Sequence, residues 1–159
     1  MKKPDTKFIV KAGIVAAIYA VLTIIFRELS YGPVQYRIAD AMTILPIFMP
    51  EAIPGLAVGC FIANIVGGYG LADVIFGSLV TLAAAYLTSR IANKYFAILP
   101  PIIMNAVFVS IWISRAAHIP YWMCVGTIGF GEFITAGILG VLLASYIERR
   151  NFKDTVIFH

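Results

Sequence analysis

Charged residues are scarce in this chain, and the familiar catalytic motifs are missing from it. Only 13% of the 159 residues are charged, against about 25% in an average soluble domain. The 2 cysteines, Cys60 and Cys124, lack Cys-x-x-Cys spacing, and the 2 histidines stand alone. There is no His-Glu-x-x-His, no Gly-x-Ser-x-Gly and no phosphate-binding loop ending in Gly-Lys-Ser/Thr. We therefore expect no enzyme, no metal site and no resident cofactor.

Most of the residues in the chain are apolar. Hydrophobic residues make up 61% of the chain, and the mean hydropathy is +0.92. A soluble core of this size could not bury so many apolar side chains, so the composition predicts an all-α integral membrane protein with a single membrane domain over residues 1–159. The predicted transmembrane helices cover residues 8–29, 38–49, 54–66, 71–92, 98–117 and 120–148.

The second and third of these helices are short. About 13 residues rise only ~20 Å, against a hydrocarbon core of ~30 Å. They can cross a thinned, protein-packed region or form a re-entrant hairpin. Either arrangement returns the chain to the same side, so the rest of the predicted topology is unaffected.

The distribution of Lys and Arg predicts the orientation. With both termini inside, nine of the twelve lie on the inner side, and only Arg27, Arg37 and Arg115 lie outside. The positive-inside rule then gives a multi-pass protein of the cell membrane with both termini in the cytoplasm. The basic N-terminus resembles a signal peptide, but no small-residue cleavage site follows, so we expect the first helix to be retained. The charge forms no basic stripe of the kind that binds nucleic acid.

Polar residues gather at the predicted outer ends of the helices, within 27–40, 64–73 and 115–122. Asn105 and Glu132 lie deeper, each about 12 residues, or roughly 18 Å, from the outer end of its helix. A carboxylate at that depth is costly unless it is paired or faces a cavity. Glu132 is therefore either a structural partner, in an ion pair or a helix-packing hydrogen bond, or the floor of a ligand pocket.

These residue types suit a flat, polar heterocycle. A carboxylate accepts hydrogen bonds from adjacent N–H groups such as those of a guanine-like edge. Asn or Arg can donate to a carbonyl oxygen, an aromatic ring can stack on the heterocycle, and a second carboxylate can bind a cationic amine. Trp122 equally suits the aromatic belt of a membrane interface. The predicted substrate-binding residues are Tyr36, Arg37, Asp40, Asn64, Tyr69, Asp73, Asn105, Trp122 and Glu132.

Small residues follow one face of the first helix. Ala12, Ala16 and Ala20 are four residues apart and so form a groove into which another helix can pack closely. The groove is predicted to dock a partner protein, although a contact within the chain explains the pattern equally well.

The chain resembles the substrate-binding (S) components of energy-coupling factor transporters, in particular the QueT-type family for queuosine precursors. The resemblance rests on Val34–Thr43, Pro50–Gly55, Asn64–Asp73 and Gly131–Glu132, and it extends over about Ala12 to Glu148. It implies six transmembrane helices and capture, from the outside, of a 7-deazaguanine such as preQ1, preQ0 or queuine. It also implies docking, through the alanine face of the first helix, on a membrane coupling protein driven by two ATP-binding subunits.

Two other functions remain open on the sequence alone. The chain can be an S component for another vitamin, such as a flavin or thiamine, because such a protein would share the alanine groove. It can also be a small membrane scaffold without a ligand, in which case Asn105 and Glu132 serve stability alone.

Overall fold

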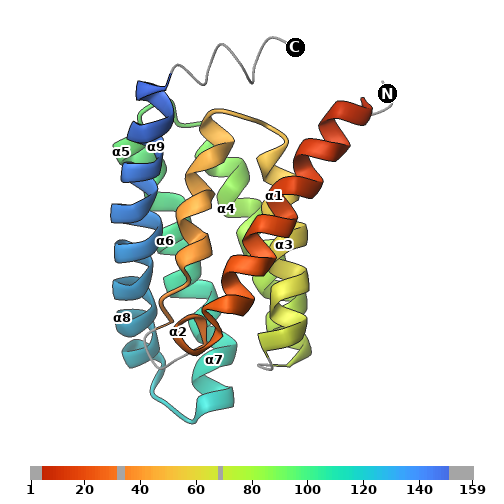
Figure 1. The fold of residues 1–159 in the computed structure, drawn as a ribbon. Helices are drawn as coiled ribbons and strands as arrows, with labels where there is room; N and C mark the ends of the chain where they lie inside the picture. The colour runs from red at the N-terminus through yellow and green to blue at the C-terminus, as the bar shows by residue number, and fades with distance from the viewer. Residues whose placement is uncertain (1–4, 32–34, 68–69, 151–159) are drawn as a thin grey trace.

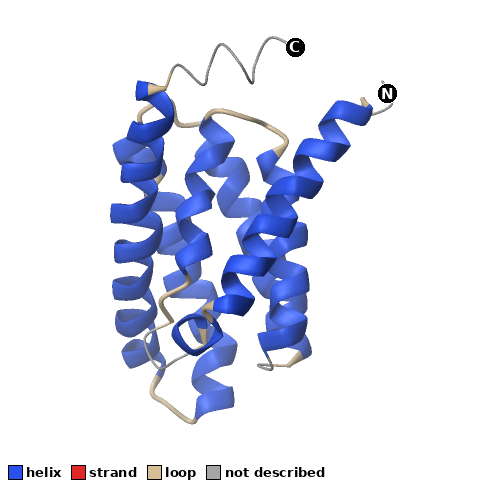
Figure 2. Cartoon of the chain, in the orientation of Figure 1, coloured by secondary structure: helices blue, strands red, loops and turns tan. Residues whose placement is uncertain are grey.

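The computed structural model describes residues 5–31, 35–67 and 70–150, and all regular structure in these ranges is helical (Figure 2). The helices form rods that run side by side along one bundle (Figure 1). Three rods are long and apolar enough to cross a membrane: Thr6–Ile25, Lys94–Ala117 and Tyr121–Arg149. Three shorter apolar rods cover Ile38–Ile47, Ala52–Gly67 and Asp73–Ser89. The predicted all-α class is confirmed; six membrane crossings stay a prediction.

The rods divide into shorter elements at bends and changes of helix type. In chain order the elements are α1 (Thr6–Ile25), α2 (Arg27–Ser30), η1 (Ile38–Ile47), α3 (Ala52–Gly67), η2 (Asp73–Gly77), α4 (Ser78–Ser89), α5 (Lys94–Ala97), α6 (Leu99–Met104), η3 (Asn105–Val109), α7 (Ser110–Ala117), α8 (Tyr121–Glu132), η4 (Phe133–Leu139) and α9 (Gly140–Arg149). The predicted first helix is thus interrupted at Phe26. The third helix, predicted to begin at Pro54, begins at Ala52 in the structure. Pro54 therefore lies in its first turn, where proline is tolerated.

The second rod differs most from its prediction. Its ten residues form a 3₁₀ helix, η1, with Pro46 inside it. Proline has no N–H to donate, and in an α-helix its ring would clash with the carbonyl four residues earlier. A 3₁₀ helix rises about 2.0 Å per residue, so η1 spans about 20 Å. The predicted shortness is therefore right, but the helix type could not be read from the sequence.

Three π-helical segments interrupt the remaining rods. η2 begins at Asp73, η3 begins at Asn105, and η4 follows directly after Glu132. Such segments are rare and occur often at functional sites, because the extra residue per turn changes the direction of the side chains around it. In this bundle each one coincides with a buried polar residue.

The first and last described helices share one end of the bundle. α1 begins and α9 ends at the upper end in Figure 1. At the start of the fifth rod, the Lys94 Nζ donates to Glu148 Oε2 at 2.7 Å and to Ser145 Oγ at 3.0 Å, which ties that rod to α9. The start of α1 and the end of α9 therefore lie at the same end of the bundle, and the orientation of the chain in the membrane stays a prediction.

α1 and α3 pack with almost no space between their backbones. A Cβ atom added at Gly55 would lie 2.7 Å from the Ala12 carbonyl oxygen, and one at Gly59 would lie 2.8 Å from that of Ala16. The Gly55-x-x-x-Gly59 spacing is a close-packing pattern of membrane helices. Ala16 and Ala20 are consequently buried within the molecule. Ala20 is covered, and Ala16 forms only the floor of a groove bordered by Ala12, so part of the alanine face makes the contact within the chain that the sequence also allowed. Docking of a partner through this face stays a prediction.

Replacing Gly59 with alanine should destabilise the bundle by about 1–3 kcal/mol, because the new methyl group collides with the α1 backbone. Thermal unfolding of the detergent-purified chain measures the effect. Gly126→Ala is the matched control, since nothing lies within 4 Å of a Cβ there, and alanine favours a helix over glycine by roughly 0.5–1 kcal/mol. Equal unfolding temperatures for the two variants would contradict the close packing of α1 on α3.

Candidate functional site

A set of polar side chains lies buried between the rods, where apolar packing would be expected. They come from η1 and the residue before it, from α3, from the starts of η2 and η3, and from the end of α8. They are Arg37, Asp40, Asn64, Asp73, Asn105 and Glu132, all buried. Burying so many charged and amide groups is costly, so each must have partners in the protein or in a ligand.

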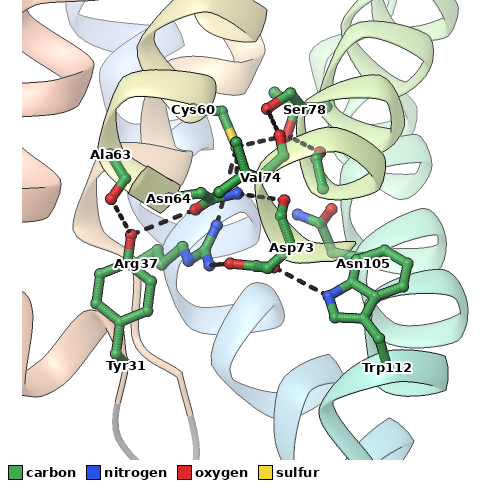
Figure 3. A network of polar contacts seen from close by, with 12 residues as sticks. Tyr31, Arg37, Cys60, Ala63, Asn64, Asp73, Val74, Ser78, Asn105 and Trp112 are labelled. Carbon is green, nitrogen blue, oxygen red and sulfur yellow. Dashed lines mark hydrogen bonds and ion pairs between the residues drawn. The ribbon is translucent and has the colours of Figure 1, made fainter. Parts of the chain in front are cut away.

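One half of this network centres on Asp73. Its Oδ2 lies 3.5 Å from Arg37 Nη2, and its Oδ1 accepts a hydrogen bond of 3.0 Å from Trp112 Nε1. Its backbone carbonyl accepts from Asn64 Nδ2 at 2.9 Å. Figure 3 shows Asp73 between the guanidinium group of Arg37 and the indole ring of Trp112. Residues from four rods therefore meet on one aspartate.

Tyr31 covers the Arg37 side of this half. The Arg37 guanidinium lies 5.0 Å from the centre of the Tyr31 ring, and the Tyr31 hydroxyl donates to the Ala63 carbonyl at 2.8 Å (Figure 3). Gly67 makes this position possible, since a Cβ there would collide with the Tyr31 ring. Burial raises the pKa of Tyr31 to about 12, so its hydroxyl stays protonated and remains a donor at neutral pH.

Cys60 lies at the back of this half and accepts several polar hydrogens. Its Sγ is 3.3 Å from Thr81 Oγ1, 3.4 Å from Asn64 Nδ2 and 3.9 Å from Arg37 Nη1. Cys60 therefore does more than pack as a small hydrophobic residue. Its sulfur gives two polar side chains of the network a weak acceptor within an otherwise apolar interior.

The other half of the network contains two carboxyl groups. Tyr19 donates to Asp40 Oδ1 at 2.5 Å, and Asn105 Nδ2 donates to Glu132 Oε1 at 2.7 Å. The Asp40 and Glu132 side chains also interact with each other. Their second oxygens, Asp40 Oδ2 and Glu132 Oε2, are buried and have no hydrogen-bond partner among the described residues.

The charges of the network do not balance. Within the described residues it holds the carboxyl groups of Asp40, Asp73 and Glu132, but a single buried cation, Arg37. Since an unpaired charge is strongly disfavoured in a low-dielectric interior, the excess must be offset by protons or by a cationic ligand.

The structure brings together most of the residues that the sequence singles out, but not all. Trp122 is 78% exposed, and its ring packs edge-on against that of Tyr121 with 5.0 Å between the ring centres, as in an interfacial aromatic belt. Tyr36 is half-buried and makes no side-chain hydrogen bond within the described ranges. Tyr69 lies outside the described residues. Trp122 thus stands apart from the network.

Sequence reasoning missed four residues of the network. Tyr31 lies in a predicted polar segment but is not among the predicted binding residues. Tyr19, Cys60 and Trp112 lie within apolar runs, where aromatic residues and cysteine are expected to pack as hydrophobes. Tyr19 and Trp112 share one weak signal. Each carries a polar O–H or N–H group within an apolar helix, and such groups usually find a hydrogen-bond partner when they are buried.

An apolar groove runs along the outside of the bundle next to the network. It has a volume of about 500 Å³ and lies between the fourth and fifth rods, with Phe76, Leu79 and Phe108 in its lining. Trp112 belongs to both places, because its ring lines the groove while its Nε1 reaches Asp73. Apart from Arg115 and the Trp112 ring, the lining of the groove is apolar, and it contains no carboxylate that could accept from a heterocycle.

Trp112→Phe should lower the free energy of unfolding by roughly 1–3 kcal/mol, because Asp73 Oδ1 loses its donor in a buried place. Trp122→Phe is the control, since it makes the same chemical change on an exposed ring. We expect it to alter stability by less than about 0.5 kcal/mol. Thermal unfolding of both variants measures the difference, and equal losses would show that the Trp112–Asp73 bond does not stabilise the network.

Comparison with known proteins identifies the family to which this chain belongs. The family model described as "QueT transporter" matches residues 9–149. The chain is also 30% identical to the "Queuosine precursor transporter QueT" of Lactococcus lactis subsp. cremoris (strain MG1363), over 94% of this chain and 97% of that protein. No solved structure matches. The matched region includes every helix that contributes to the buried network, and the chain therefore belongs to the QueT transporter family.

Proposed function

We propose that this protein is the substrate-binding membrane subunit of an energy-coupling factor importer and that it captures a queuosine precursor from outside the cell. The observation that carries the proposal is the buried polar network, which has two carboxylate oxygens with neither a hydrogen-bond donor nor an ion pair among the described residues. A scaffold without a ligand would gain nothing from two such oxygens, since each costs free energy. The printed name of the Lactococcus relative supports the cargo class.

The chemistry of the network suits a 7-deazaguanine. Such a base presents adjacent N–H donors to a carboxylate and a carbonyl oxygen to Arg or Asn. Asp73 can accept from the donor edge, Arg37 and Asn64 can donate to the carbonyl, and the other two carboxyl groups remain for a cationic substituent. The rings of Tyr31 and Trp112 flank the network and offer faces for stacking (Figure 3).

The chain needs partners to drive uptake, because it carries no ATP-binding loop. The proposed partners are a membrane coupling protein and two ATP-binding subunits. The proposed docking surface is the groove beside α1, which has a volume of about 350 Å³ and is bordered by Ala12, Gly13, Pro54 and Val58. A helix of the coupling protein can approach closely there, because the groove is lined by small and apolar side chains.

Thermal unfolding with a ligand panel tests the cargo. The panel contains preQ1, preQ0, queuine, guanine, riboflavin and thiamine, each added to the detergent-purified chain. A ligand at 100 times its Kd stabilises the folded protein by about 2.7 kcal/mol. We expect this shift with one or more deazaguanines and none with the two vitamins. A shift with riboflavin or thiamine alone would instead make the chain an S component for a different cargo.

Gly13→Leu should block assembly with the coupling protein and abolish uptake while leaving ligand binding intact. A Cβ at Gly13 meets nothing within 4 Å inside the molecule, so the leucine fills the groove without disturbing the fold. Ala16→Leu is a poorer test, because Ala16 is packed against Gly59. Co-purification with the coupling protein is the measurement. Gly126→Leu, at an equally open position on α8, is the control; if both variants co-purify normally, this groove is not the docking surface.

A further inference from the structure

The two unpartnered carboxylate oxygens are on neighbouring elements of the bundle. Asp40 lies in η1, and Glu132 ends α8 immediately before η4. η1 packs against η4, and the Asp40 and Glu132 side chains interact. In each carboxyl group one oxygen is already occupied, by Tyr19 in Asp40 and by Asn105 in Glu132. The two free oxygens therefore form a buried acceptor pair, here called the Asp40–Glu132 pair.

Arg37 is poorly placed to neutralise this pair. Its Nη2 faces Asp73 at 3.5 Å, its Nη1 faces Cys60, and its plane lies over the Tyr31 ring. Both free oxygens remain without a donor even though Arg37 is the buried cation of the network. The negative charge of the pair is therefore offset either by a proton held between the two carboxyl groups or by a cation from outside the described side chains.

Resting on the proposed function, we infer that the Asp40–Glu132 pair selects for positive charge on the ligand: it takes 7-deazaguanines whose 7-substituent carries a protonated amine in preference to neutral ones. An ammonium group has three donors and can reach both oxygens at once. Charge-assisted hydrogen bonds are roughly twice as strong as neutral ones. A neutral substituent brings no charge, so the pair must then keep a proton of its own or stay unneutralised in a low-dielectric interior.

Three ligands of nearly equal size separate charge from shape and from hydrogen bonding. They are 7-aminomethyl-7-deazaguanine, which is cationic, 7-hydroxymethyl-7-deazaguanine, which is neutral but can donate, and 7-cyano-7-deazaguanine, which is neutral and cannot donate from its substituent. Isothermal titration of the full chain in detergent gives the three affinities. We expect the amine to bind roughly 10- to 100-fold more tightly than the hydroxymethyl compound, with the nitrile no tighter than the latter.

The Asp40→Asn and Glu132→Gln variants test whether this pair is the source of the preference. Each keeps the shape of the side chain and can place an N–H toward the opposite oxygen. We therefore expect the amine to lose roughly 10- to 100-fold in affinity while the neutral ligands lose less than about threefold. Glu51→Gln is the matched control, since Glu51 is bonded to Lys11 and makes no contact with the network in the described ranges. It should preserve the preference.

The outcomes separate this inference from the proposed function. If the unmodified chain binds the amine and the neutral ligands equally well, or if both variants retain the preference, charge selection by the pair is wrong while deazaguanine binding stands. If none of the three ligands binds, the proposed function and this inference both fail. The comparison on the unmodified chain decides between these outcomes even where a variant does not fold.

Discussion

Burial of charge in an apolar bundle is the constraint on which the rest of this structure depends. Asp73 is fully buried, and its carboxylate is tolerated because Arg37 and Trp112 reach it from two different rods while Asn64 holds its backbone carbonyl. None of these partners is near Asp73 in sequence except Asn64. The network therefore forms only when the rods are correctly assembled, so it helps to specify the fold as well as being the proposed ligand site.

The same constraint accounts for the irregular helices. A regular α-helix repeats its side-chain directions every 3.6 residues, which allows only part of one face to point inward. The π-helical segments at Asp73, Asn105 and after Glu132 change that direction where a polar side chain must point into the network. The 3₁₀ helix that carries Asp40 has a comparable effect in the second rod, with Thr43 donating to the Asp40 carbonyl at 2.6 Å.

The sequence allows the fold class and much of the network to be predicted, for one physical reason. Polar residues in apolar runs are costly, so Asp40, Asp73 and Glu132 stand out by residue type alone. Trp112 and Trp122 show where this reasoning ends. Both have an apolar ring with a polar tip, and only the packing of the fifth and sixth rods turns one toward Asp73 and leaves the other exposed. The 3₁₀ and π segments were equally beyond prediction, because hydrophobic periodicity does not distinguish them from an α-helix.

α1 links the two parts of the molecule that a transporter subunit has to coordinate. Tyr19 on this helix donates to Asp40 in the network, while Ala12 and Gly13, about two turns away, border the proposed docking groove. Between them α1 packs closely on α3, with its Val15 and Tyr19 side chains against Gly55 and Gly59. A partner that moves α1 would then also move the donor that orients Asp40, and the ligand site would respond to docking through a single hydrogen bond.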